Sequence, residues 1–218
     1  MPFFDLTEAE ILRGKTTSDA STLGKIFKSK SSKFHRLNVD HNRLEEFLSS
    51  GWEEHGTPLK TKTKIQKAKS HDAQFEDDIW CQLYKLGFRN LNIDREYHLP
   101  FGPNPNDRKQ IDIIATNDDT VQLIECKSSE SPRKAPSFKT EFEALRQRLN
   151  GHRKALEQIF GKGKKVKYIF ATRHLRLSRE STDIQRLEDA GGFFYNDNTF
   201  DYVESLIRHY KNAAQYQF

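Results

Sequence analysis

The sequence predicts an α/β protein with a mixed β-sheet flanked by helices. From residue 73 onward the apolar pattern changes in the order helix, three strands, helix, strand. A tight turn at Asp118-Asp119 joins two of the strands as an antiparallel hairpin. The apolar stretch KVKYIFAT follows the longest helix, which indicates a crossover that returns a strand beside the hairpin.

The expected elements follow from periodicity and from glycine stops. Strands are expected over residues 91–99, 110–117, 120–128, 165–172 and 193–195. Helices are expected over residues 73–87, 140–160, 180–190 and from 199 to the end, with shorter ones at 6–12 and 40–48. The segment SPRKAPSFK reads as a basic loop between strand and helix.

Two units are expected along the chain. Residues 1–70 are rich in Ser, Thr and Lys and read as a basic arm or small appendage. Residues 71–218 form the α/β domain with a C-terminal helical extension. That last helix carries Val203, Leu206, Ile207, Tyr210 and Ala214 at core spacing and reaches residue 218 without a stop signal. We therefore expect either a further C-terminal domain or a homo-oligomer that covers it.

Composition restricts the class of protein and the type of partner. Charged residues make up 31% and hydrophobic residues 35%, and no apolar run is long enough to span a bilayer. The N-terminus lacks the features of a signal peptide, so a soluble cytoplasmic protein with no membrane partner is expected. A net charge of +5 suits a polyanion such as nucleic acid. Cys81 and Cys126 have no metal or disulfide spacing and read as small buried hydrophobes.

The hairpin places two acidic residues together. If Asn117 pairs with Thr120, then Asp112 lies opposite Glu125 on one face, and Lys127 follows on the same face. Two opposed carboxylates destabilise a sheet unless something offsets their repulsion, and a divalent cation such as Mg²⁺ would do so. Because Asp-Asp is a weak hairpin turn, a one-residue slip remains open and would separate the pair.

The helix over residues 73–87 supplies a third acidic residue. Glu76 lies between Leu83 and Trp80 on the helical wheel, inside the apolar arc, whereas Asp77 and Asp78 lie outside it. A carboxylate in an apolar stripe is rarely tolerated without a partner. Glu76 therefore either joins the two acids of the hairpin or borders the core and reaches water.

These residues carry a resemblance to a known family. Asp112, twelve further residues and then Glu125-Cys126-Lys127 resemble the D-x(n)-E-x-K signature of the PD-(D/E)XK nuclease superfamily, which has the restriction-endonuclease-like fold. The resemblance covers about residues 73–172, and Ile111 stands where the family name has Pro. The segments GWEEHGTPLKTKTKIQKAKSHDAQFEDDIW, QIDIIA and ECKSSE are also similar to the N-terminal nuclease-like region of bacterial DGQHR-domain proteins.

The resemblance implies an α-β-β-β-α-β core, phosphodiester hydrolysis and a Mg²⁺ site in which Mn²⁺ can substitute. Asp112 and Glu125 would hold the metal, with Glu76 as a direct or water-mediated ligand and the Cys126 carbonyl as a further oxygen. Lys127 would orient the attacking water and stabilise charge near the scissile phosphate. Its other reading is an ion pair with the adjacent acids.

The charge pattern suggests nucleic-acid contacts near this site and in the basic arm. The candidates are Lys60, Lys62, Lys64, Lys67, Lys69, Arg108, Lys109, Arg133 and Lys134, each of which could equally be a solvated surface charge. We expect a DNA endonuclease, with host defence or restriction as its setting. The alternatives are a DNA-binding or assembly module that kept the fold and lost catalysis, and a nuclease that acts on RNA.

Overall fold

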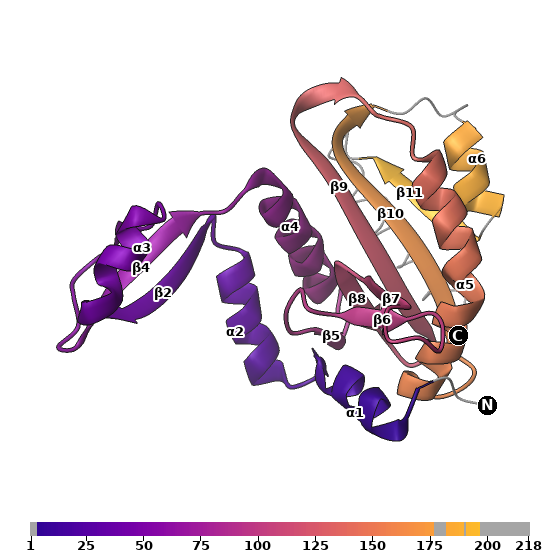
Figure 1. Cartoon of the computed structure of the whole chain (residues 1–218), viewed down its shortest axis with the longest axis horizontal. Coiled ribbons are helices and arrows are strands. Elements are labelled where there is room, and N and C mark those ends of the chain that lie inside the picture. Colours follow the sequence, from indigo (N-terminus) through magenta and orange to yellow (C-terminus); the bar gives the residue numbers. More distant parts are fainter. Residues whose placement is uncertain (1–3, 177–181, 190, 197–218) are drawn as a thin grey trace.

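The main sheet has six strands in the order β1-β5-β8-β9-β10-β11 (Figure 1). The computed structural model describes residues 4–176, 182–189 and 191–196. The strands are β1 (Thr16–Thr17), β5 (Asn90–Asn92), β8 (Ile113–Thr116), β9 (Thr120–Lys134), β10 (Lys165–Arg176) and β11 (Gly192–Asn196). The pairs from β1 to β9 are antiparallel, whereas β10 is parallel to both β9 and β11. The predicted mixed sheet is confirmed.

Helices cover both faces of this sheet (Figure 1). One face carries α2 (Ala20–Lys30) and α4 (His71–Lys85), and the other carries α1 (Leu6–Gly14), α5 (Lys139–Phe160) and α6 (Thr182–Asp189). Strand alternation divides the core accordingly. Ile113 and Ile124 pack with the residues of α4, whereas Ile114 and Leu123 pack with those of α5. The helices predicted over 73–87, 140–160 and 180–190 are confirmed within a few residues.

The hairpin has the predicted register. Ile114 lies opposite Leu123, and the Asn117 amide donates to the Thr120 carbonyl at 3.0 Å. The side-chain oxygen of Asn117 accepts from the amides of Asp119 and Thr120 at 3.1 and 2.7 Å. Asn117 therefore stabilises a turn that the Asp-Asp pair alone would form poorly.

The predicted strand over 91–99 is wrong, because the structure divides it between two sheets. β5 ends at Asn92, and β6 (His98–Pro100) pairs with β7 (Arg108–Gln110) in a separate two-stranded sheet. The buried Asn92 side chain donates to the carbonyls of Asp94 and Asp112 and accepts from the Ile114 amide. A side chain thus replaces the ladder bonds here, and the chain leaves the sheet in a turn that carries Arg95.

The predicted basic loop after residue 128 also differs from the structure. β9 continues to Lys134, where Arg133 and Lys134 pair with Leu175 and Arg176 of β10. A register irregularity between Arg173 and Leu175 accompanies this extension, and His174 there has a φ of 59°. Arg133 and Lys134 are therefore exposed strand residues beyond Lys127.

Residues 4–70 contribute to two different parts of the structure. α1 contacts α5, α2 contacts α4, and β1 pairs with β5, so residues 6–30 belong to the main body. The remainder projects from it as a small sheet in the order β2-β4-β3 with a helix (Figure 1). Its elements are β2 (Phe34–Asp40), the 3₁₀ helix η1 (His41–Arg43), α3 (Leu44–Ser49), β3 (Glu53–Glu54) and β4 (Lys62–Ala68). We call residues 34–68 the projecting unit.

The two ends of the projecting unit meet. The Lys69 amide donates to the Lys33 carbonyl at 3.0 Å, so the chain leaves and re-enters the main body at one place. The lysine-rich stretch from Lys60 is mostly the central strand of this small sheet.

α5 lies unusually close to the loop after β6. A Cβ atom at Gly151 would lie 1.9 Å from the carbonyl oxygen of Phe101, so only glycine allows this approach. No helix within the described residues is long and apolar enough to cross a membrane. The helix predicted from residue 199 lies outside the described residues, so the further domain or homo-oligomer inferred from it stays a prediction.

Candidate functional site

The hairpin brings Asp112 to the Glu125-Cys126-Lys127 segment. Asp112 directly precedes β8, and extending the β8–β9 register by one residue places it opposite Glu125. The Cys126 amide donates to Oδ2 of Asp112 at 2.8 Å. The Asp112 carboxylate thus accepts the hydrogen bond that a strand carbonyl would otherwise accept here. This bond holds Asp112 beside Glu125 and Lys127.

The charges around this pair are unequally compensated. Glu125 accepts from Lys127 at 2.9 Å and from Lys109 at 3.2 Å, so two lysines neutralise one carboxylate. Burial and the neighbouring charge of Glu125 raise the pKa of Asp112, although the Cys126 amide opposes the shift. Burial alone would lower the pKa of Lys127, but Glu125 raises it above its ordinary value. Lys127 therefore stays protonated, and Asp112 is the poorly compensated acid.

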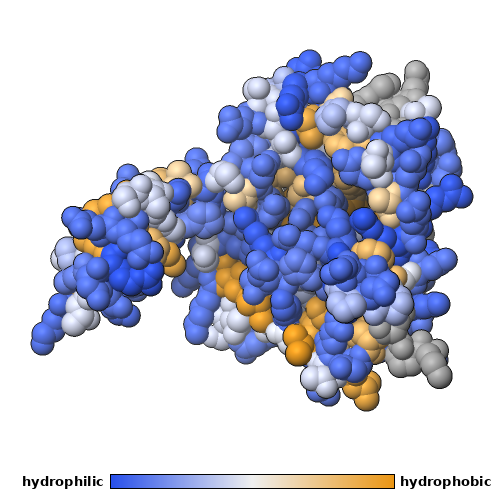
Figure 2. Space-filling view, viewed as in Figure 1, coloured by the Kyte–Doolittle hydropathy of each residue, from blue (hydrophilic) through white to orange (hydrophobic). Residues whose placement is uncertain are grey.

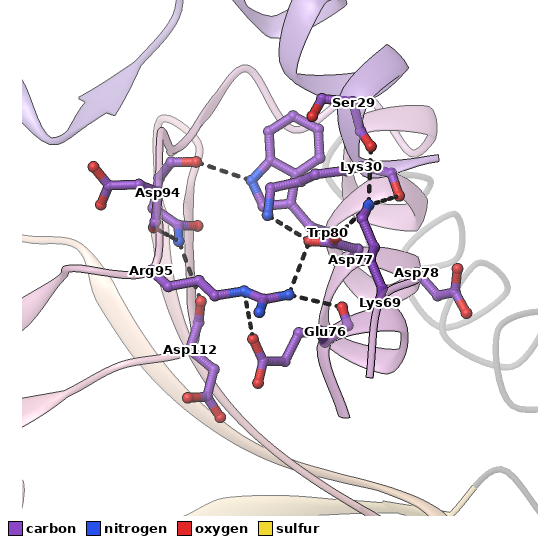
Figure 3. A network of polar contacts seen from close by, with 12 residues as sticks. Ser29, Lys30, Lys69, Glu76, Asp77, Asp78, Trp80, Asp94, Arg95 and Asp112 are labelled. Atoms are coloured by element: carbon purple, nitrogen blue, oxygen red, sulfur yellow. Dashed lines mark hydrogen bonds and ion pairs between the residues drawn. The ribbon is translucent and has the colours of Figure 1, made fainter. Parts of the chain in front are cut away.

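Glu76 lies on the α4 side of the same site. Its side chain is 19% exposed, and its carboxylate forms an ion pair with Nε of Arg95 at 2.8 Å. Burial raises the pKa of Glu76 to about 7, Arg95 opposes this shift, and Asp112 adds to it. In Figure 3 the Arg95 side chain extends from its turn to α4 and contacts Glu76 there.

Asp77 has a role that the sequence did not reveal. The helical wheel placed it outside the apolar arc, but its side chain is only 5% exposed. It pairs with Lys30 and Lys69 at 2.7 Å each and with Arg95 at 3.3 Å (Figure 3). Burial works against ionisation, yet Lys30 and Lys69 lower the pKa of Asp77. Because α4 packs against α2 as well as against the sheet, its buried arc is wider than that of a helix with one partner.

The donor atoms suit a hard cation such as Mg²⁺. Asp112, Glu125 and Glu76 offer carboxylate oxygens, and Mg²⁺ is commonly held by one or two carboxylates together with water and substrate phosphate. Among the described residues, however, no three or more His, Cys, Asp or Glu side chains are grouped so as to hold an ion. Glu125 is turned to its lysines and Glu76 to Arg95. Metal binding by Asp112 and Glu125 would therefore require Glu125 to turn from its lysines, and a contribution from Glu76 would require it to turn from Arg95.

The predicted nucleic-acid contacts have different surroundings. Lys69 is 3% exposed beside Asp77, and Arg108 pairs with Glu8 at 2.8 Å, so both hold the fold together. Lys67 donates to the Ser50 carbonyl, and Lys109 faces Glu125. Lys60, Lys62, Lys67, Arg133 and Lys134 are exposed and Lys64 is half-buried, with Lys62 beside Asp40 at 3.8 Å.

The predicted small buried cysteines are confirmed, since Cys81 and Cys126 are both buried with free thiols. Burial raises the pKa of the Cys81 thiol to about 11 and that of Cys126 well above its ordinary value. Neither thiol is therefore suited to act as a nucleophile.

Comparison with known proteins gives distant structural neighbours only. No family model and no curated protein matches the chain. A structure titled as a protein of unknown function, AF1548, is 14% identical with a TM-score of 0.42, covering 63% of this chain and 65% of that one. Protein VC1899 from Vibrio cholerae is 14% identical with a TM-score of 0.37, and the matched region is 94% of this chain but 53% of that one. Function is therefore argued from the site.

Proposed function

We propose that the chain is a metal-dependent nuclease of the PD-(D/E)XK type. The observation that carries the proposal is the joining of Asp112 to Glu125 and Lys127 through the Cys126 amide at the end of the hairpin. Asp112, Glu125 and Lys127 lie together where the start of β8 faces the middle of β9, and acids that can hold a metal beside a cation that can stabilise a phosphate suit metal-assisted phosphodiester hydrolysis. The order of α4, the three antiparallel strands, α5 and β10 agrees with the core that the resemblance implies.

Each side chain has a distinct part in the proposed reaction. Asp112 and Glu125 would hold Mg²⁺ or Mn²⁺ with the Cys126 carbonyl, and Glu76 would contribute directly or through water. The metal, when bound, polarises the phosphate and acidifies a water molecule. Lys127 remains charged and lies beside Glu125, where it can orient the attacking water and stabilise the phosphoryl oxygens. DNA is the proposed substrate, with host defence or restriction as the setting.

Metal-induced stabilisation provides the first test. A cation that binds only the folded state raises the melting temperature by mass action. We expect Mg²⁺ or Mn²⁺ to stabilise the wild type, and Asp112→Ala and Glu125→Ala to lose this effect together with cleavage of plasmid, single-stranded DNA and RNA. Asp112→Asn is the matched variant, because its side-chain oxygen can still accept from the Cys126 amide while the charge is gone. A wild type that shows neither stabilisation nor cleavage of any nucleic acid would overturn the proposal.

The second candidate is a DNA-binding or assembly module without catalysis. The double neutralisation of Glu125 by Lys109 and Lys127 favours it, since a carboxylate held by two cations needs no metal. Titration distinguishes the two. The module would bind DNA without divalent metal and keep that affinity in Asp112→Ala, whereas the nuclease requires metal for cleavage and loses cleavage in that variant.

A further inference from the structure

A pocket opens directly beside the proposed catalytic residues. It has a volume of about 400 Å³ and lies between α5 and the sheet, where β9 and β10 provide one wall. Glu125 and Lys127 line it from β9, and Lys109 lines it from β7. Figure 2 shows a hollow with apolar surface inside and hydrophilic surface around it, in the region where Figure 1 places β9, β10 and α5. The proposed site therefore continues into the body of the protein.

The far wall of this pocket is apolar. Phe142 and Leu145 from α5 and Tyr168 and Phe170 from β10 line it. All four belong to the buried core on the α5 side and are only 2–7% exposed, so this wall is part of the packed core. Where apolar surface of this kind borders a pocket, it accepts a nucleobase by exclusion of water, with little preference for the base.

The polar wall carries an excess of positive charge. Lys109, Lys127 and Arg148 contribute three cations, against the carboxylates of Glu125 and Glu141. The guanidinium of Arg148 lies 5.1 Å from the centre of the Phe101 ring, which holds it in place at the pocket. A phosphate can thus meet cations at the same end at which the proposed catalytic residues lie.

We infer that this pocket takes one nucleotide of the substrate strand, with its base on the apolar wall and its phosphate toward Lys109, Lys127 and Arg148. The inference rests on the proposed function, which identifies the substrate as a nucleic-acid strand. A volume of about 400 Å³ is that of a small-molecule site and cannot admit a base pair with both its strands. The substrate is therefore a single strand, a strand end, or a duplex from which one nucleotide has been turned out.

Binding of small ligands tests the pocket without any need for catalysis. Calorimetry with a nucleoside monophosphate, the matching nucleoside and inorganic phosphate should rank the monophosphate tightest, because only it uses both walls. Ala144 is half-buried and lines the pocket from α5, so Ala144→Phe should fill it and weaken monophosphate binding at least about tenfold. Gln147→Phe, exposed on the same helix and not among the lining residues, should bind as the wild type does. Phosphate binding as tightly as the monophosphate would overturn the inference.

The charged wall has its own matched pair. Arg148→Gln should weaken the monophosphate and leave the nucleoside unchanged, whereas Arg146→Gln, exposed on α5 outside the pocket, should change neither. Circular dichroism and the metal-induced shift in melting temperature check that each variant is folded with its metal site intact. Equal losses in Arg148→Gln and Arg146→Gln would mean non-specific charge and contradict the inference.

Cleavage then separates this inference from the proposed function. We expect single-stranded DNA to be cleaved at least about tenfold faster than a blunt duplex of the same sequence, and Ala144→Phe to remove most of that activity. Cleavage of duplex at the single-strand rate, unchanged in Ala144→Phe, would overturn the inference and leave the nuclease standing. If the wild type cleaves nothing but binds the monophosphate, and Ala144→Phe blocks that binding, the nuclease proposal would be overturned and the pocket inference would stand.

Discussion

Two neighbouring residues of α4 meet opposite electrostatic surroundings. Asp77 is surrounded by Lys30, Lys69 and Arg95, and the two lysines lower its pKa in spite of burial. Glu76, one residue earlier, has Arg95 as its ion-pair partner, and its pKa rises to about 7. Two adjacent residues of the 15-residue helix α4 thus differ. The charge of Asp77 is fully compensated by neighbouring cations, whereas that of Glu76 is not.

The difference separates an acid that supports the fold from acids that can receive a cation. The charge of Asp77 is satisfied by the protein itself, and removal of its carboxylate would leave Lys30 and Lys69 buried without their anion. Asp112 and Glu76 are both poorly solvated, and the charge of Glu125 adds to the cost at Asp112, so a metal bound there would relieve a cost that the protein alone carries. Arg95 forms ion pairs with both Glu76 and Asp77 and therefore links the two groups of charges.

The largest effect is expected from removing the carboxylate of Asp77, whose charge Lys30, Lys69 and Arg95 compensate. Asp77→Ala leaves Lys30 and Lys69 buried without their anion, which should lower the free energy of unfolding by about 3–5 kcal/mol. Asp78→Ala, next along α4 and paired at the surface with Arg173, should cost about 0–1 kcal/mol. Urea unfolding measures both. Similar decreases in the two variants would show that the burial of Asp77 carries no special energy.

The next largest effect concerns Lys127, the lysine beside Glu125 in the proposed catalytic site. Lys127→Ala should lower the cleavage rate about 10²–10³-fold, because one cation that stabilises the transition state is removed. Metal-induced stabilisation should persist, since Lys127 competes with the metal for Glu125. Lys154→Ala, exposed on α5, is the control. An equal decrease in metal affinity and rate would reassign Lys127 to holding the metal site together.

A smaller effect, on the order of 2 kcal/mol, is expected in the pH dependence of stability. The pKa of Glu76 in the folded protein, about 7, lies above its ordinary value of 4.5, so the folded state binds the additional proton. Its contribution to stability therefore grows as pH falls from 8 toward 5. Glu76→Gln should stabilise the metal-free protein at pH 8 and have little effect at pH 5.

Unfolding in urea at several pH values, with exposed Glu143→Gln as the control, measures this dependence. Added Mg²⁺ should reverse the trend for the wild type, because protonation of its ligands weakens metal binding. If the difference in unfolding free energy between Glu76→Gln and the wild type does not change with pH, then Glu76 does not have a raised pKa in the folded protein.

The smallest effect should come from the projecting unit. Because Lys33 and Lys69 are hydrogen-bonded neighbours, residues 34–68 can be replaced by two glycines while Lys30 and Lys69 remain at Asp77. This unit has six basic and five acidic residues, so its removal should lower nucleic-acid affinity only modestly. The slope of log affinity against log salt should become shallower by about 0.9 for each phosphate that the unit neutralises in the intact protein. A trimmed chain that fails to fold would show that the unit is part of the core.

The sequence predicted those parts of the site that depend on local pattern. Strand alternation and a two-residue turn were sufficient to place Asp112 near Glu125 and Lys127, and helical spacing brought Glu76 toward them. The environment of Asp77 was missed because Lys30 and Lys69 come from segments that read as a weakly ordered arm. Their contact depends on α2 packing against α4, and no periodicity within α4 records a second helix.

Arg95 was missed for a related reason. Its segment reads as a continuous strand, and only the side-chain bonds of Asn92 show why the strand stops there. A buried amide that satisfies three backbone groups leaves no sign in hydropathy. The catalytic role of these residues and the identity of the metal remain predictions that the experiments above address.

The close approach at Gly151 has a consequence for the order of folding. Glycine near the middle of a helix lowers its intrinsic stability by up to about 1 kcal/mol relative to alanine. The segment Lys139–Phe160 taken alone should therefore be a helix weakened near its centre, and the packing of Phe101 against Gly151 in the folded protein offsets that cost. Gly151→Ala should increase the helicity of the isolated peptide and yet destabilise the protein. The α5 side of the pocket is thus completed by docking and not by helix propagation.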